Sequence, residues 1–461
     1  MESGGSRERW GTKVGFILAA AGSAIGLGNI WKFPYVAGEN GGAAFVLIYI
    51  VFVIILGLPI MIAELVIGRH TEKDPVGAFK VIAGGTKWVF VGYLGVLSGF
   101  FILSFYSVVG GWTLGYIVKS ISGTAAGIDS IETAKGVFQE FSMDPLLMIL
   151  YHFLFMGSCM VIVIRGIKKG IERWSKVLMP LLFFILIVLI IKGLSMEGSF
   201  RGLSFFLKPD FSKITADSII AALGQSFFSL SLGMGAMITY GSYLSKKEKI
   251  LHSAMYIVLL DTLIAILAGF AIFPAVFAMN MSPKGGPGLI FHIIPAVFGK
   301  MEFGYIFSTL FFVLLFIAAL TSGMSLLEVV TAYIIDERGW SRRKGVYVTG
   351  TIIFLLGVPS ALSFGVIRDA TYFLGNNFFD FMDKLTSNYM LPIGGFFIAI
   401  CLGYKYGLEN TIHELDPDTR VISLKELWAF FIKFISPFLI LFLFIMLIRD
   451  DIVSLFSRLF G

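Results

Sequence analysis

The sequence AGSAIGLGN at residues 21–29 interrupts an apolar stretch with three glycines, and SLSLGMG at residues 229–235 interrupts a second stretch in a similar way. Glycine weakens a helix interior by about 1 kcal/mol relative to alanine. At membrane depth, unwound backbone survives only where protein or a water-filled cavity satisfies its polar groups. The two breaks therefore predict a binding site. The alternative is that small residues merely allow neighbouring helices to pack closely.

The rest of the chain is typical of an all-α integral membrane protein. It has 461 residues, of which 57% are hydrophobic and only 14% are charged. A bilayer core needs roughly 20 apolar residues for each spanning helix, and we expect eleven transmembrane helices in a single transporter domain, 1–461. They begin near Val14, Ala43, Trp88, Pro145, Val177, Ser218, Leu251, Phe303, Gly345, Leu385 and Leu427.

The position of the breaks suggests internal symmetry. They fall in the first and sixth spans, which are corresponding positions of two five-span halves. Paired interruptions of this kind indicate an inverted-repeat transporter. We therefore expect a 5+5 inverted repeat with broken helices 1 and 6, in which residues 1–193 form the first repeat, 218–406 form the second, and 427–448 add a further helix.

Charge and cysteine usage fit a membrane carrier. Alternating the spans from a cytoplasmic N-terminus places most Lys and Arg residues on cytoplasmic segments, which predicts an extracellular or periplasmic C-terminus in a plasma (inner) membrane protein. The net charge of +6 lies in short loops facing the lipid bilayer and forms no basic stripe, so we expect no nucleic-acid partner. Cys159 and Cys401 lie inside apolar spans and predict neither a disulfide nor a metal site.

Oxygen-bearing side chains near the breaks point to a hard cation, for which the oxygen ligands are Asn29, Ser229, Asp261, Thr321 and Ser322. Asp261 is the most informative, because a carboxylate inside an apolar span is costly without a cation or proton. The alternative for Asp261 is protonation or a bond to a neighbouring helix. We expect structural roles for Glu64, which is near Arg69 in sequence, and for Glu328.

Several motifs resemble those of the neurotransmitter:sodium symporter family, and the resemblance covers spans one to eight well and the remainder loosely. They are RERW at 7–10, GLGNIWKFP at 26–34, ENGGAAF at 39–45, GQSFFSLSLG at 224–233 and LTS at 320–322. The resemblance is to the solute carrier 6 type, and within it to the prokaryotic subgroup that carries hydrophobic and aromatic amino acids. It implies the leucine-transporter-type fold and sodium-coupled symport by alternating access.

The resemblance also implies two sodium sites. One would use the carbonyls of Gly22, Ile25 and Ala318 with the hydroxyls of Thr321 and Ser322. The other would use the Ala24 carbonyl, Asn29, Ser229, Asp261 and the carboxylate of the substrate itself. Because the substrate and the ion share a ligand, each raises the affinity of the other by the same factor.

The same resemblance assigns the amino-acid site. The substrate carboxylate would bind the amides of Leu27 and Gly28 and the hydroxyl of Tyr106, although a membrane tyrosine alone more often serves packing. The substrate site as a whole would comprise Ala24, Leu27, Gly28, Ile102, Tyr106, Phe228, Ser229, Ser231, Met234, Ser322 and Leu326. Within it, Ile102, Phe228, Met234 and Leu326 would line the side-chain pocket, which favours hydrophobic and aromatic amino acids.

Gates are implied at both ends of the transport path. Arg7 and Asp336 match the cytoplasmic gate pair, with Trp10 and Tyr243 nearby. At the outer gate, Lys32 stands where the family usually has arginine. Its partner is Asp380 or Asp383, and the spacing favours Asp383.

Family members that need chloride have neutral residues in the seventh span near one sodium ion. Asp261 would already supply a fixed negative charge at that ion, so we expect transport to be independent of chloride. The sequence as a whole predicts a sodium-coupled importer of hydrophobic or aromatic L-amino acids, with no enzymatic activity. The alternatives are a symporter of another small amino acid or amine, a channel, or a non-transporting amino-acid sensor; protein partners are unknown.

Overall fold

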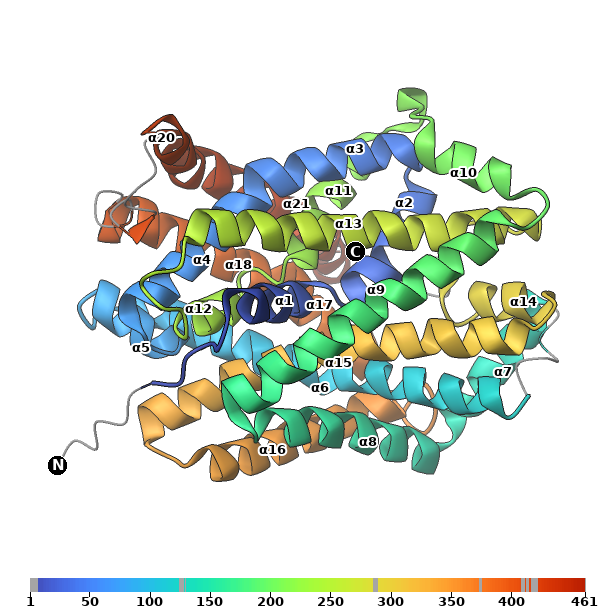
Figure 1. Cartoon of the computed structure of the whole chain (residues 1–461), viewed down its shortest axis with the longest axis horizontal. Coiled ribbons are helices and arrows are strands. Elements are labelled where there is room, and N and C mark those ends of the chain that lie inside the picture. The colour runs from blue at the N-terminus through green and yellow to red at the C-terminus, as the bar shows by residue number, and fades with distance from the viewer. Residues whose placement is uncertain are drawn as a thin grey trace.

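The fold is entirely helical throughout the part of the chain that the computed structural model describes. Its helices lie roughly along one long axis, as Figure 1 shows. The described residues are 7–123, 128, 130–284, 289–372, 375–407, 411, 414–415 and 422–460.

Among these residues, nine helices are long and apolar enough to cross a membrane. They are Ala43–Thr71 (α3 and α4), Val89–Ile121 (α6), Pro145–Val163 (α8), Ile167–Leu194 (with α9), Ile250–Ala278 (α13), Gly304–Arg338 (α15), Arg342–Leu362 (α16), Phe378–Tyr406 (α17 and α18) and Lys425–Arg449 (in α20 and α21). A tenth span is bent by 52° and consists of Lys13–Ala24 (α1) and Gly28–Glu39, which includes α2 (Phe33–Glu39).

The second predicted break separates α11 (Ala216–Ser229) from α12 (Ala236–Gly241). Neither piece alone is long enough to span a bilayer, so the total of eleven spans stays a prediction. Three residues of this break have left-handed backbone: Ser231 (φ +55°), Gly233 (φ +83°) and Gly235 (φ +74°). Glycine adopts such angles readily, whereas a non-glycine residue held there indicates local strain at a functional site.

Short helices cover the two ends of the bundle. At one end lie the N-terminus, α5 (Pro75–Ile82) and α12; at the other lie α7 (Ile131–Met143), α10 (Ser199–Leu207) and α14 (Ile293–Gly299) (Figure 1). We call the first the Arg7 end and the second the Lys32 end.

The broken helix α1 runs through the interior of the bundle, where it packs on α9, α13 and α15. Its central residues Ala19, Ala20 and Ala21 are fully buried, because their small side chains let the surrounding helices come close. A similar close approach joins α4 to α12: a Cβ on Gly68 would lie 2.0 Å from the carbonyl oxygen of Ile238. The two broken helices are thus held by tight contacts in the core.

Candidate functional site

The end of α1 meets α15 in a cluster of oxygen atoms. The Ser322 hydroxyl lies 3.4 Å from the Gly22 carbonyl oxygen and 3.5 Å from that of Ile25. The hydroxyl of the adjacent Thr321 donates at 3.0 Å to the carbonyl of Ala318, one turn earlier in α15. All five residues that the sequence assigns to one cation site therefore lie together around the first break.

A second cluster joins the same break to α11 and α13. The Asn29 side chain lies 3.0 Å from the Ser229 hydroxyl and 2.8 Å from one Asp261 carboxylate oxygen. Ser229 donates to the other carboxylate oxygen at 2.8 Å. The Tyr49 hydroxyl, which sequence reasoning missed, completes the group at 3.3 Å from that of Ser229.

The chemistry of both clusters suits sodium. The hydroxyls of both clusters and the Asp261 carboxylate are hard oxygen ligands, and the last carbonyls of α1 have no donor within their own helix. Asn29 turns its amide nitrogen toward Asp261, while its Oδ1 accepts the Gly26 amide at 3.2 Å. Asp261 is completely buried, and within the described residues no lysine or arginine pairs with it. A buried carboxylate needs a compensating positive charge or proton. A transported sodium ion would supply that charge in this position.

Next to these clusters, the unwound backbone of α1 faces Tyr106 and Phe228. The amide of Leu27 lies 3.3 Å from the Tyr106 hydroxyl. A Cβ on Gly26 would lie 2.8 Å from the same hydroxyl, and one on Gly28 would lie 3.3 Å from the Phe228 ring. Glycine at positions 26 and 28 lets these side chains approach the unwound backbone, and the Leu27 amide donates to the Tyr106 hydroxyl. Unwound amide groups of this kind can bind a carboxylate.

This backbone forms the floor of a cavity of about 270 Å³ that extends toward the Lys32 end. Its walls are mainly aromatic, and the lining residues include Leu27, Trp31, Lys32, Tyr106, Trp112, Phe228, Phe291, His292, Phe379, Asp380 and Asp383. Of the predicted side-chain pocket, Phe228 lines this cavity, while Ile102, Met234 and Leu326 are buried outside its lining.

Lys32 contacts a ring at the mouth of this cavity. Its ammonium group lies 4.1 Å from the centre of the Phe228 ring, a cation–π geometry. Asp380 and Asp383 line the same cavity, yet neither forms an ion pair with Lys32 in the described part of the chain. The pairing of Lys32 with Asp383 therefore stays a prediction.

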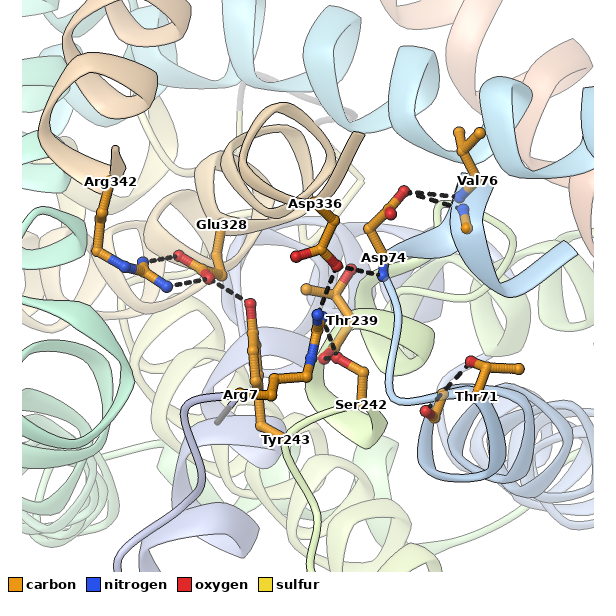
Figure 2. Close-up of polar contacts among 12 residues, drawn as sticks. Arg7, Thr71, Asp74, Val76, Thr239, Ser242, Tyr243, Glu328, Asp336 and Arg342 are labelled. Carbon is orange, nitrogen blue, oxygen red and sulfur yellow. Dashed lines mark hydrogen bonds and ion pairs between the residues drawn. The ribbon is translucent and has the colours of Figure 1, made fainter. Parts of the chain in front are cut away.

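A polar network closes the Arg7 end (Figure 2). Arg7 forms an ion pair with Asp336, donates to the Ser242 hydroxyl at 2.8 Å and lies 4.8 Å from the centre of the Tyr243 ring. Trp10 donates its indole hydrogen to the Tyr240 carbonyl at 3.0 Å. The four predicted residues Arg7, Trp10, Tyr243 and Asp336 thus come together.

Two further acids extend this network: Glu328, for which the sequence predicts a structural role, and Asp74, which sequence reasoning missed. Glu328 accepts from the Tyr243 hydroxyl at 2.7 Å and from Arg342 at 2.7 and 3.1 Å. Asp74 donates its backbone N–H to Asp336 at 2.9 Å. Burial and the neighbouring Asp336 carboxylate raise the pKa of Asp74 to about 7.

Glu64 does not act with its sequence neighbour Arg69. Its carboxylate accepts the Gly233 amide at 2.7 Å, inside the second break, whereas Arg69 pairs with Glu414. Its structural role is therefore to satisfy unwound backbone. The sequence showed only a carboxylate inside an apolar span. Such a group requires hydrogen-bond or charge partners, but the sequence does not identify them.

The sequence is similar to those of known membrane transporters. The model of the sodium:neurotransmitter symporter family matches residues 7–129 and 145–455. The chain is 41% identical to the sodium-dependent transporter YhdH of Bacillus subtilis (strain 168), over 95% of this chain and 97% of the relative. It is 37% identical to a sodium-dependent transporter of Haemophilus influenzae (strain ATCC 51907 / DSM 11121 / KW20 / Rd), over 95% and 98%.

A solved structure agrees with the fold. The crystal structure of MhsT in complex with L-phenylalanine superposes with a TM-score of 0.87 at 46% identity, covering 95% of this chain and 99% of that one. The leucine-transporter-type fold predicted from the sequence is thereby confirmed. The chain belongs to the sodium:neurotransmitter symporter family and is a sodium-dependent membrane transporter, not an enzyme.

Proposed function

We propose that this protein imports hydrophobic and aromatic L-amino acids by symport with two sodium ions, independently of chloride. In this proposal it lies in the plasma (inner) membrane with its N-terminus in the cytoplasm and its C-terminus outside. The observation that carries the proposal is the fully buried Asp261 carboxylate, held by Asn29 and Ser229 beside the unwound end of α1.

The two oxygen clusters would each bind one sodium ion. The Asp261 cluster contains Asn29, which directly follows the amides of Leu27 and Gly28 in the unwound segment; the Leu27 amide now donates to the Tyr106 hydroxyl. A substrate carboxylate on those amides would lie beside this ion and complete its coordination. Substrate and sodium then raise each other's affinity by the same factor. Tight coupling of this kind allows a sodium gradient to drive accumulation of the amino acid.

The walls of the site favour an apolar side chain. Phe228 lies directly over Gly28, and the neighbouring predicted pocket residues Ile102, Met234 and Leu326 are all buried. A methionine between two glycines can repack around side chains of different size. The L-phenylalanine bound by MhsT has this character.

Chloride independence rests on charge. A bound sodium ion in a buried site needs a nearby negative charge, and Asp261 provides one that is part of the chain. No anion has to be recruited from solution. We therefore expect the same uptake when chloride is replaced by gluconate.

Alternating access is supported by the different states of the two ends. The Arg7 end is closed by ion pairs and edge-to-face aromatic rings, whereas the cavity opens toward the Lys32 end. If the Arg7 end faces the cytoplasm, this is an outward-facing arrangement. Import would then require Arg7 to leave Asp336 after Phe228 and Lys32 close the other side.

The test is uptake of radiolabelled tryptophan, tyrosine, leucine and alanine into proteoliposomes. Inward gradients of sodium or potassium are compared, with chloride or gluconate as the anion. Concentrative uptake of the large apolar amino acids that needs sodium but not chloride is the expected result. Accumulation of alanine alone, or of none of the four, contradicts the substrate assignment and directs attention to small amino acids, amines or a sensor.

A further inference from the structure

Asp74 is built into the closed gate at the Arg7 end. It caps α5, where its Oδ1 accepts the amides of Val76 at 2.8 Å and Gly77 at 3.3 Å. Its own backbone N–H donates to Asp336 Oδ2 at 2.9 Å, and Arg7 pairs with that same oxygen. Figure 2 shows Asp336 bridging Arg7 and Asp74. The capping residue of α5 is thus a direct partner of the gate.

Within the part of the chain that the structure describes, the second carboxylate oxygen of Asp74 has no hydrogen-bond partner. This oxygen, Oδ2, is buried. It faces a further acid: a Cβ added to Gly77 would lie 2.9 Å from Asp74 Oδ2 and 3.2 Å from Glu337 Oε1. An unpaired, buried carboxylate oxygen beside a second acid is unfavourable when ionised.

The cations around this point are paired with other acids or lie at the surface. The acids are Asp74, Asp336 and Glu337; the cations are Arg7, which pairs with Asp336, and Lys80, which pairs with Glu337. The other titratable groups are Lys73 beside Asp74, Tyr243 against Arg7 and Tyr93 of α6 near Lys80. Arg7 and Lys80 already have their own acids and Lys73 is exposed at the surface, so within the described residues no ion pair compensates Asp74.

We propose that Asp74 binds a proton in the closed gate and releases it when the gate opens, so that acidity at the Arg7 end holds the gate closed. This inference rests on the gate role proposed for Arg7 and Asp336. It adds a residue that senses the pH on one side of the membrane to the transport cycle.

The direction of the effect follows from burial. In the closed gate, desolvation and the Asp336 charge raise the pKa of Asp74 from 3.8 to about 7. Departure of Arg7 would admit water and return the pKa toward its ordinary value. The closed form therefore binds the proton, and the bound proton stabilises it relative to the open form. This stabilisation is present below about pH 7 and is lost as the pH rises through that value. Between pH 8 and pH 6 the closed-to-open ratio should rise about tenfold.

The experiment measures gate opening directly. Spin labels are attached to the variants Lys13→Cys, in α1, and Arg343→Cys, in α16, both at exposed positions. The native residues Cys159 and Cys401 are buried and leave these sites to be labelled selectively. Distance distributions in nanodiscs are recorded by double electron–electron resonance from pH 5.5 to pH 8.5. The expected result is a shift toward the closed distance as the pH falls below about 7, and the pH at which the two populations are equal is the midpoint compared between variants.

Three variants isolate Asp74. Asp74→Asn keeps an acceptor for the helix cap and mimics the protonated acid, so the distances should stay closed at every pH. Glu337→Gln leaves the cap intact and removes one neighbouring charge, so the midpoint should fall. Asp144→Asn is the matched control, because Asp144 also caps a helix before a proline, with its Oδ1 3.0 Å from each of two amides; it should behave as the parent.

An unchanged pH response in Asp74→Asn overturns the proposal. So does a Glu337→Gln midpoint that stays where the parent has it, which keeps the test decisive if Asp74→Asn fails to fold. The distances report on the gate whatever the chain transports. Failure of sodium-coupled amino-acid uptake therefore leaves this measurement able to support or reject the role of Asp74.

Discussion

Replacing Asp261 with asparagine is the sharpest test of the proposed sodium site. The variant removes one unit of charge and almost no volume. In the parent, Asn29 and Ser229 each lie 2.8 Å from a carboxylate oxygen of Asp261. In the variant, the new amide oxygen can still accept from Asn29, and the new amide nitrogen can donate to Ser229. The fold should therefore tolerate the change, and the effect should appear in sodium binding.

The expected magnitude follows from the charge that is lost. Two unit charges about 4 Å apart attract by about 4 kcal/mol at an effective dielectric constant of roughly 20. Part of this is offset, because the neutral side chain no longer carries the desolvation cost of a buried carboxylate. A net loss of about 1.4 to 2.8 kcal/mol raises the sodium concentration for half-maximal uptake by about 10- to 100-fold.

The assay is amino-acid uptake into proteoliposomes as a function of external sodium. It is run in chloride and in gluconate, because an anion bound near the site could replace the missing charge. We expect chloride to restore part of the sodium affinity of the variant and to leave the parent unchanged. Ser253→Ala is the matched control, since Ser253 is buried in the same helix α13 with a hydroxyl that has no partner in the described structure.

A half-maximal sodium concentration that is unchanged in Asp261→Asn would refute the assignment of this carboxylate to sodium. An equal rise in Ser253→Ala would refute it as well, because the effect would then reflect damage to α13. Thermal unfolding of each purified variant in sodium and in potassium shows whether the protein remains folded and whether sodium still stabilises it.

Three further substitutions probe the rest of the site. Thr321→Val removes one hydroxyl of the other oxygen cluster at a cost of about 1 kcal/mol, so sodium affinity measured by sodium-dependent binding should fall about fivefold. Tyr106→Phe should weaken binding of radiolabelled amino acid about tenfold while leaving substrate-free sodium stabilisation unchanged, because the lost hydroxyl faces the substrate carboxylate. Gly26→Ala would place a methyl group 2.5 Å from the Ser322 hydroxyl, so substrate binding in a scintillation proximity assay should be lost.

Local composition was enough to predict the breaks and to single out Asp261. Glycines inside apolar spans predict unwound backbone at any membrane depth, and both predicted breaks are present. Asp261 stood out because a carboxylate in an apolar span is costly wherever its partners lie. The pairing of Arg7 with Asp336 came from resemblance to a family, since 329 residues separate them and no local pattern connects them.

Contacts that depend on tertiary structure were beyond the sequence. Ser231 adopts left-handed backbone because the break between α11 and α12 requires it, although its residue type gives no sign of this. Glu64 was expected to have a structural role, but the sequence did not indicate its partner, the Gly233 amide. Lys32 was expected to pair with an acid, yet its ammonium group lies over the Phe228 ring. In each case a distant segment decides the partner.

The position of α1 explains how ion binding can control the gate. Its C-terminal end supplies the Gly22 carbonyl to the cluster on α15, and the segment just beyond supplies Asn29 to the cluster on α13. Just before its N-terminal end, Trp10 and Arg7 hold the gate closed. Sodium in the two clusters would therefore fix α1 against both neighbours, and loss of sodium would free the same helix that carries the gate. Coupling between the ions and the gate then needs no chain of intermediate residues, because one short helix connects them.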